Sequence, residues 1–247
     1  MILTKEQILL ASKISATDAD IRLEEFKKYN TLEPKEKYYD LNRIKAVFPN
    51  ANYFDIGTVE GLHGQIDDYL LIMFRGSDSV WDWIKNFLFY KKVIPYDGTN
   101  PKIRVHSGFL KNYKSVREYV HKIVKESPVK KVVVFGHSMG GAVSVLAALD
   151  IQYNFKDVEV GCFTIGTPRI GNEYFKASFE RRLPDYKHAD YGSDLVAQIP
   201  PLCFGFSVLD KFYHLGPDRR KGIGTKKDHN WHLYNNALID EIDKIIS

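Results

Sequence analysis

The sequence predicts an α/β fold in which a mostly parallel central sheet is flanked by helices. Residues 132–135 are four consecutive β-forming residues, and apolar residues recur at helical spacing after Ser138. Another apolar run at residues 160–165 completes a strand–helix–strand unit, whose two strands are expected to be parallel. Strand and helix patterns alternate along the chain without repeats or a linker. Residues 1–247 are therefore predicted to form one domain.

The other elements are predicted in chain order. Thr4-x-x-Gln7 is typical of a capping box and begins an amphipathic helix over residues 5–28, within an N-terminal helical region of about residues 1–50. Two strands, 53–59 and 69–74, are expected to be joined by a turn at residues 61–64, Gly-Leu-His-Gly. One apolar face predicts a helix over 109–124, ended by Ser127-Pro128. The last predicted elements are a strand at 186–191, a hairpin-like stretch at 204–215 and a helix at about 230–246.

Composition restricts the class of protein. The 247 residues are 44% hydrophobic and 27% charged, which suits a globular α/β domain with a sizeable core. The net charge of +4 is modest, and nothing indicates nucleic-acid binding. Basic residues gather in one cluster, for which a solvated loop is preferred over a phosphate contact. The cluster consists of Arg219, Arg220, Lys221, Lys226 and Lys227.

Two features bear on the compartment. The sequence has two cysteines, Cys162 and Cys203, which do not predict a disulfide framework and are compatible with a reducing compartment. No apolar run is long enough to span a bilayer, and the first residues lack a charged-then-apolar leader. The expectation is a cytoplasmic protein, or a secreted one if a signal peptide has been removed.

The segment Gly136-His137-Ser138-Met139-Gly140 places a serine at the corner between a predicted strand and a predicted helix. In this context Gly-x-Ser-x-Gly is typical of a nucleophile elbow, where a Cβ on either glycine would collide with the neighbouring backbone. Ser138 is therefore the candidate nucleophile. The alternative is that Ser138 only caps the helix.

A serine nucleophile needs a histidine base and a carboxylate that orients the histidine. Asp194 is the preferred carboxylate because it follows the strand at 186–191, and strand ends carry the functional groups of such sheets. Asp190 is the alternative. Among the later histidines, His229 is preferred because it lies in a polar loop before the last helix. The candidates are His188, His214, His229 and His232.

Five segments between about Tyr69 and Leu238 resemble, in the same order, class 3 lipases of the fungal triacylglycerol lipase type. They are Phe74-Arg75-Gly76-Ser77-Asp78-Ser79 with Trp83-Ile84-Lys85-Asn86, His106-Ser107-Gly108-Phe109-Leu110, Gly136-His137-Ser138-Met139-Gly140-Gly141, Thr164-Ile165-Gly166-Thr167-Pro168-Arg169-Ile170-Gly171-Asn172, and Asp194-Leu195-Val196 with Pro200. The resemblance implies a single α/β-hydrolase domain with a short lid segment. It also implies an acylglycerol lipase, which cleaves lipid esters through an acyl-serine intermediate and needs no cofactor or metal.

The resemblance also implies roles for individual residues. Ser138 is the nucleophile, Asp194 the orienting acid, and Ser77 and the backbone N–H of Met139 the oxyanion donors. The block Asp228–Leu238 aligns His229 with the base, followed five residues later by a tyrosine as in bacterial members. A shorter His-Leu-x-Tyr spacing in other members would favour His232. His214 resembles a recurrent position that is not catalytic.

The segment after Ser77 is rich in large apolar residues, and part of it lies on one helical stripe. Such a face can cover an active site in water and turn toward a lipid–water interface. The candidate lid and substrate-binding residues are Val80, Trp81, Trp83 and Ile84. The alternative is that these side chains pack permanently in the core.

Other functions are compatible with parts of these patterns. The same fold would suit a phospholipase A1, a soluble carboxylesterase of the feruloyl type or a thioesterase. A lipase-like binding protein without activity would be expected to lack a triad or oxyanion residue, and all of them are present. His229-x-x-His232 lacks the third ligand or the helical motif that a zinc site needs. A lipid ester is therefore the expected partner, and protein partners are not predicted.

Overall fold

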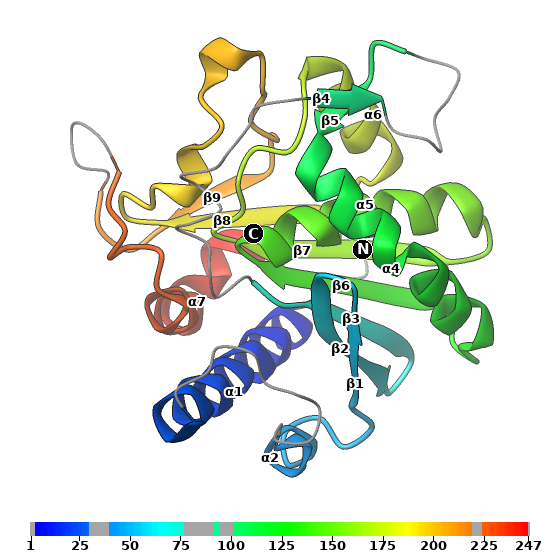
Figure 1. Ribbon diagram of the computed structural model, residues 1–247, viewed down its shortest axis with the longest axis vertical. Helices are drawn as coiled ribbons and strands as arrows, with labels where there is room; N and C mark the ends of the chain where they lie inside the picture. The colour runs from blue at the N-terminus through cyan, green and yellow to red at the C-terminus, as the bar shows by residue number, and fades with distance from the viewer. Residues whose placement is uncertain (1–2, 30–39, 77–90, 94–100, 219–223, 247) are drawn as a thin grey trace.

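The computed structural model describes residues 3–29, 40–76, 91–93, 101–218 and 224–246. A seven-stranded sheet with helices on both faces forms its centre, which confirms the predicted α/β-hydrolase type of fold (Figure 1). The strand order is β1-β2-β3-β6-β7-β8-β9.

The first three strands form an antiparallel meander at one edge of the sheet. They are β1 (Asn52–Ile56), β2 (Val59–Ile66) and β3 (Tyr69–Phe74). The predicted turn at residues 61–64 is wrong, because these residues lie inside β2, where all four pair with β3 and the first three also pair with β1. The glycines serve close packing there: a Cβ on Gly64 would lie 2.3 Å from the carbonyl oxygen of Asn50.

The remaining strands of the sheet run parallel to β3, so their carboxyl ends meet at one edge of the sheet. They are β6 (Lys131–His137), β7 (Glu159–Ile165), β8 (Tyr186–Tyr191) and β9 (Phe212–Leu215). The predicted hairpin at 204–215 is wrong: its first residue ends a 3-10 turn, η2 (Leu202–Phe204), and its last four residues form β9, which pairs in parallel with β8. An apolar pattern shows that a strand is present but not which strand it pairs with.

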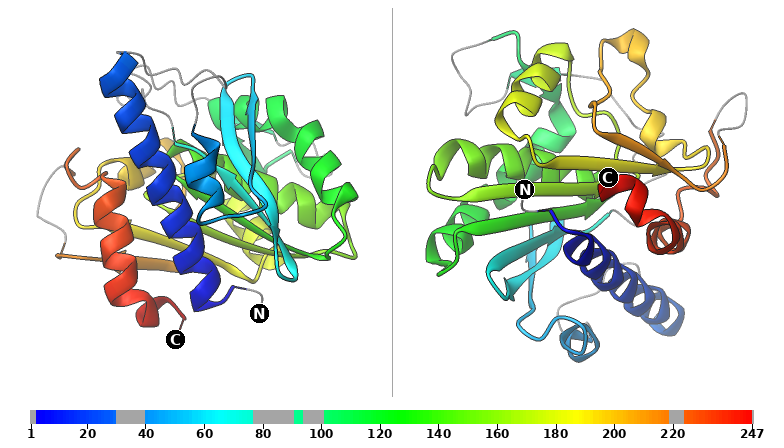
Figure 2. Two further views of the ribbon diagram at one scale, coloured as in Figure 1. Left: turned by 90° about the horizontal axis from the view of Figure 1, so that it is seen from below. Right: turned by 180° about the vertical axis from the view of Figure 1, so that it is seen from behind.

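Two layers of helices cover the sheet (Figure 2). One layer contains α4 (Ser107–Glu126), α5 (Met139–Asn154) and α6 (Glu173–Arg182). The other contains α1 (Lys5–Tyr29), α2 (Leu41–Lys45) and α7 (Trp231–Ile246). A separate pair of strands, β4 (Lys91–Val93) and β5 (Arg104–His106), is antiparallel. A further 3-10 turn, η1 (Val196–Gln198), follows Asp194 and Leu195.

The alternation of side chains along β6 divides the core into two halves. Val132 and Val134 pack with the α4–α5 layer, whereas Val133 and Phe135 pack with the α1–α7 layer. Both faces of this strand are therefore buried, which explains why its sequence is apolar without interruption.

The start of α1 and the two cysteines are further local features of the fold. The capping box is confirmed, since Thr4 N–H donates to Gln7 Oε1 (3.0 Å) and Gln7 N–H to Thr4 Oγ1 (3.3 Å). Cys162 is buried and Cys203 exposed, and both are free. Of the helices in the described part of the chain, none has the length and apolar character that crossing a membrane requires.

Replacing Leu146 by alanine tests the packing of α5 against the sheet. Leu146 is fully buried, so Leu146→Ala is expected to lower the free energy of unfolding by about 2–5 kcal/mol. Leu202, with 57% of its surface exposed, is the matched control, and Leu202→Ala should change stability by less than about 0.5 kcal/mol. Chemical denaturation measures both. Equal losses would contradict the assignment of α5 to the core.

Candidate active site

Ser138 occupies the corner between β6 and α5. Its backbone has φ +59° and ψ −129°, a strained conformation for a residue with a side chain. The side chain makes no capping hydrogen bond to the start of α5, so the helix-cap alternative is wrong. The turn instead presents the hydroxyl at the carboxyl edge of the sheet, as a nucleophile elbow does.

Two glycines allow this corner to pack against its neighbours. A Cβ on Gly140 would lie 2.2 Å from the carbonyl oxygen of Phe74 and 2.4 Å from that of Arg75, both in the segment at the end of β3. A Cβ on Gly136 would lie 2.4 Å from the carbonyl oxygen of Gly140. No side chain fits at either position, which explains the Gly-x-Ser-x-Gly spacing.

The structure brings Ser138, His229 and Asp194 together. His229 Nε2 lies 2.9 Å from Ser138 Oγ, and His229 Nδ1 lies 2.7 Å from Asp194 Oδ2. All three side chains are buried. With a proton on Nδ1, the imidazole of His229 donates to the carboxylate and can accept the hydroxyl proton of Ser138 on Nε2.

Other groups fix the carboxylate of Asp194. Val196 N–H donates to Oδ1 (2.7 Å), and the hydroxyl of Tyr234, on α7, donates to Oδ2 (2.5 Å). Burial, followed by the charge of Asp194, raises the pKa of Tyr234 well above its usual value, so the phenol remains a neutral donor. In the sequence, Tyr234 served only to align the block around His229 with that of bacterial members of the family. Its spacing from His229 was the one signal for this contact.

His137 is a further neighbour that the sequence analysis did not single out. Its ring stacks on the ring of His229, with centroids 4.7 Å apart and an interplanar angle of 21°. Its Nε2 is buried without a hydrogen-bond partner among the described residues. Burial lowers the pKa of His137 well below the usual value, and the charges of His229 and Arg22 add to this shift. A neutral ring therefore packs beside the candidate base.

The alternative candidates lie elsewhere. His232 is half-exposed, and its Nε2 lies 3.5 Å from an oxygen of Asp20 on α1. Asp190 pairs with His214, whose Nδ1 lies 2.8 Å from Oδ1 of that carboxylate. His188 Nδ1 lies 3.0 Å from the hydroxyl oxygen of Thr164. Their side chains are thus engaged away from Ser138.

The start of α5 provides one candidate oxyanion donor. Met139 is the first residue of this helix, so its backbone N–H has no acceptor within the helix and points out of the helix end. Ser77, the second candidate donor, lies outside the described residues, as do Val80, Trp81, Trp83 and Ile84 of the candidate lid. Gly76 is described and lies against the nucleophile: a Cβ on it would be 3.3 Å from Ser138 Cβ.

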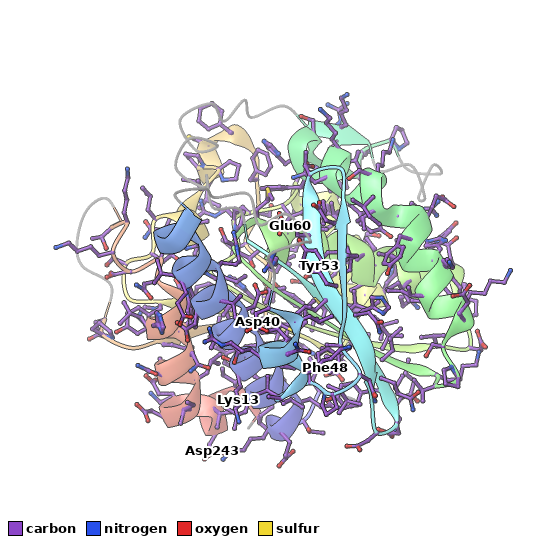
Figure 3. The ribbon with its side chains drawn as sticks, turned by 60° about the horizontal axis from the view of Figure 1, so that its bottom comes forward. Lys13, Asp40, Phe48, Tyr53, Glu60 and Asp243 are labelled. Atoms are coloured by element: carbon purple, nitrogen blue, oxygen red, sulfur yellow. The ribbon has the colours of Figure 1, made fainter. Side chains whose placement is uncertain are left out.

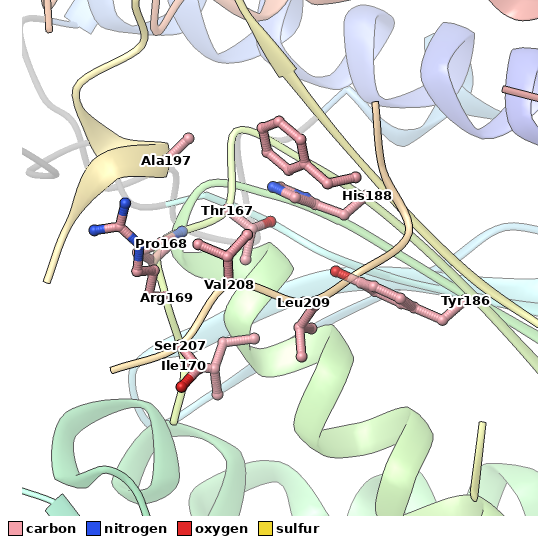
Figure 4. Close-up of a pocket in the computed structure, with 11 residues that line it drawn as sticks. Thr167, Pro168, Arg169, Ile170, Tyr186, His188, Ala197, Ser207, Val208 and Leu209 are labelled. Atoms are coloured by element: carbon pink, nitrogen blue, oxygen red, sulfur yellow. The ribbon is translucent and has the colours of Figure 1, made fainter. Parts of the chain in front are cut away.

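A small, partly open pocket lies near this site, between the loop after β7 and the segment before β9 (Figure 4). Thr167, Arg169, His188 and Leu209 contribute to its lining, and Ser138, Asp194 and His229 do not. Ala197 of η1, in the turn after Asp194, is also among the lining residues. Among the residues described, no group of three or more His, Cys, Asp or Glu side chains could hold a metal ion.

Comparison of the sequence with protein families gives a match over residues 71–204, more than half of the chain, to the family described as Lipase (class 3). A lipase from Rhizomucor miehei is 34% identical over 151 residues, which cover 58% of this chain and 40% of that protein. A secreted mono- and diacylglycerol lipase from Fusarium solani is 31% identical over 150 residues, covering 59% of this chain and 44% of the relative. The chain thus spans about two fifths of the length of these relatives.

Solved structures show the same fold. The propeptide complex of Rhizomucor miehei lipase superposes with a TM-score of 0.68 at 23% sequence identity, over 87% of this chain and 68% of that one. Lipase II from Rhizopus niveus gives a TM-score of 0.62 at 25% identity, over 83% of this chain and 78% of that one. The likeness extends beyond residues 71–204, because it covers more than four fifths of the chain.

The neutral state of His137 has a measurable consequence for stability. Because its pKa is lower in the folded protein than in the unfolded chain, acid below about pH 6.5 protonates the unfolded chain first and destabilises the fold. The free energy of unfolding is expected to fall by up to about 1.4 kcal/mol per pH unit from this group. His137→Gln should remove that part of the slope between pH 6.5 and 5.

Urea denaturation at several pH values measures the slope. His137→Phe is the second variant, because it also lacks the titrating ring while differing from glutamine in packing. Both variants should show the same shallower pH dependence, whatever their stability at pH 7. A pH dependence parallel to that of the wild type in both would contradict the burial of a neutral His137.

Proposed function

The chain belongs to the class 3 lipase family, and from this premise we propose that it is a serine hydrolase that cleaves carboxylic esters of lipids, as an acylglycerol lipase does. The observation that carries the proposal is the hydrogen-bonded series from Ser138 through His229 to Asp194, with separations of 2.9 and 2.7 Å. A hydroxyl, an imidazole and a carboxylate in this order are the groups that acyl transfer through serine requires.

The proposed reaction has two steps. His229 Nε2 takes the proton of Ser138 as Oγ attacks the ester carbonyl, and Asp194 stabilises the imidazolium that forms. The N–H of Met139, with Ser77, stabilises the negative charge on the carbonyl oxygen. The intermediate collapses as His229 gives its proton to the leaving alcohol, which leaves an acyl-serine. Water, deprotonated by His229, then attacks the acyl group and releases the fatty acid and the free serine.

Relatives support lipid esters as the substrate class. Those from Rhizomucor miehei and Fusarium solani are named as a lipase and as a mono- and diacylglycerol lipase. A phospholipase A(1) from Arabidopsis thaliana, 29% identical over 150 residues, favours phospholipids as the second candidate.

We propose Val80, Trp81, Trp83 and Ile84 as the lid residues that contact the lipid. Rates on emulsified acylglycerol, phospholipid vesicles and a soluble short-chain ester separate lipase, phospholipase A1 and esterase.

Domain organisation and compartment are part of the proposal. We propose that residues 1–247 act as a single α/β-hydrolase domain. Two free cysteines suit a reducing compartment and support a cytoplasmic location. The name of the Fusarium solani relative, a secreted lipase, supports secretion as the alternative.

Removing the hydroxyl of Ser138 tests the reaction class. Ser138→Ala should abolish ester hydrolysis and leave the melting temperature near that of the wild type, because the corner already holds a small side chain. A fluorophosphonate should label wild-type Ser138, identified by mass spectrometry of the labelled peptide, and should not label the variant. Hydrolysis at the wild-type rate by Ser138→Ala would end the serine-hydrolase proposal.

Two histidine variants test the assignment of the base. His229→Ala should lower kcat by about a thousandfold or more, since triad disruption has effects of that size. His232→Ala is the matched control, three residues along the chain, and should keep most of the activity because His232 faces Asp20. Steady-state kinetics on a soluble ester measure both. A larger loss in His232→Ala than in His229→Ala would transfer the role of the base to His232.

A further inference from the structure

A buried ion pair joins α1 to the end of β3. Arg75 Nε and Nη2 donate to Asp18 Oδ1 at 2.9 and 2.6 Å, and Nε also reaches Oδ2 at 2.8 Å. Only 5% of the Arg75 side chain and 8% of the Asp18 side chain are exposed. The guanidinium therefore makes a side-on, two-pronged contact with the carboxylate, a directional kind of ion pair.

The meander completes the surroundings of Arg75. Its Nη1 donates to the carboxylate of Glu60 on β2, which also accepts the hydroxyl of Tyr53 on β1 (2.9 Å). The guanidinium carbon lies 5.2 Å from the centre of the Tyr53 ring. Figure 3 labels Tyr53 and Glu60 on the strands beside α1. The position of Arg75 is thus determined from two sides, by α1 and by the β1–β2 pair.

The backbone of Arg75 is in direct contact with the nucleophile elbow. Its carbonyl oxygen is one of the two that a Cβ on Gly140 would strike, at 2.4 Å. The next residue, Gly76, lies against Ser138 Cβ and against the carbonyl oxygen of His137, at 3.3 and 3.2 Å from its own would-be Cβ. A shift of Arg75 therefore shifts the segment that packs on Ser138.

Helix α1 also reaches the other side of the site. Ser12 Oγ donates to Oδ1 of Asn235 on α7 (2.8 Å), the residue after Tyr234. Arg22, one turn after Asp18, adds a positive charge that lowers the pKa of His137. One helix thus contacts the arginine next to Gly76 and the helix that carries Tyr234, and its Arg22 places a positive charge near enough to act on His137, next to Ser138. This helix precedes residues 71–204, where the family match lies.

We propose that α1 positions the active site through the Asp18–Arg75 ion pair, and that Asp18 is a positioning residue for the hydrolysis. The inference rests on the proposed function, because its effect is on that reaction. Asp18 does not touch the reacting atoms; it acts through Arg75 on the placement of Gly76 against Ser138. A buried ion pair adds little net stability, because desolvation offsets the attraction, whereas its geometry is specific.

Asp18→Asn in the 247-residue chain tests the role. Asparagine keeps the size of the side chain but loses the charge and one acceptor oxygen, so Arg75 is held less firmly. We expect kcat on a soluble short-chain ester to fall by about 10- to 100-fold, the range for a small misplacement, with KM within twofold of the wild type. The inhibition constant of a trifluoromethyl ketone, which forms a tetrahedral adduct with the serine, should rise by the same factor as kcat/KM falls.

Three variants on the same helix serve as controls. Glu24→Gln removes one carboxylate charge from an exposed pair with Arg43 and should leave kcat unchanged. Ile14→Val, in the buried face of α1, should lower the melting temperature and leave kcat unchanged. Asp18→Glu restores the carboxylate and should recover part of the kcat lost in Asp18→Asn.

The outcomes separate the alternatives. If Asp18→Asn lowers the melting temperature as Ile14→Val does but keeps kcat within twofold of the wild type, the ion pair is only structural. That result would overturn the proposal. If Asp18→Asn does not fold, Arg75→Lys decides, because lysine keeps the charge but loses the two-pronged contact: a reduced kcat at constant KM supports positioning, and a wild-type kcat overturns it. A wild type that neither hydrolyses esters nor reacts with the fluorophosphonate refutes the proposed function itself, independently of these variants.

Discussion

The close packing of the elbow against the end of β3 is the constraint on which the site depends. Because β3 and β6 pair in parallel, with Phe74 opposite Gly136, the residues after β3 necessarily reach the corner at Ser138. Gly140 makes room for two carbonyl groups there, and the strained backbone of Ser138 is held by packing from both sides. The sheet thus determines where the hydroxyl lies, and the loops after β8 and before α7 have only to bring a carboxylate and an imidazole to it.

The buried polar groups around the hydroxyl show how this environment is maintained. The carboxylate of Asp194 accepts hydrogen bonds from a backbone N–H and a phenol in addition to its contact with His229, so its orientation does not depend on the histidine alone. His137 is different, since its buried Nε2 has no partner in the described residues and its ring remains neutral. A charged ring at that position would repel the imidazolium that forms on His229, so neutrality beside the base is an advantage in the proposed reaction.

The sequence predicted the parts of the molecule that depend on local patterns. The strand, elbow and helix around Ser138 follow from residue type and spacing; Asp194 was predicted from its place after a strand, and His229 from its place in a polar loop before the last helix and from the family resemblance. Local patterns failed for the glycines at residues 61–64, because glycine occurs both in turns and where a strand packs closely against its surroundings. Gly61 and Gly64 suggested a turn, but they lie within β2 and make room for residues outside that strand. Local patterns also did not predict which strand pairs with β9. Contacts between distant segments, such as that of Tyr234 with Asp194, depend on the assembled fold and left almost no trace in the sequence.

The N-terminal helix α1 shows most clearly that contacts between distant segments depend on the assembled fold. In the sequence, Asp18 and Arg22 are two charges on an amphipathic helix, and a solvent-exposed face would be their ordinary place. In the fold α1 lies across the sheet beside β3, so both charges become part of one cluster with Arg75 and Glu60. Two guanidinium groups and two carboxylates then balance in charge, so the buried pair of Asp18 and Arg75 and the partly buried Glu60 and Arg22 leave no net charge near Ser138. In the proposed role of Asp18, a helix before the family-matched segment thus helps to determine the position of the elbow, alongside α5, which follows Ser138, and α7, which carries Tyr234.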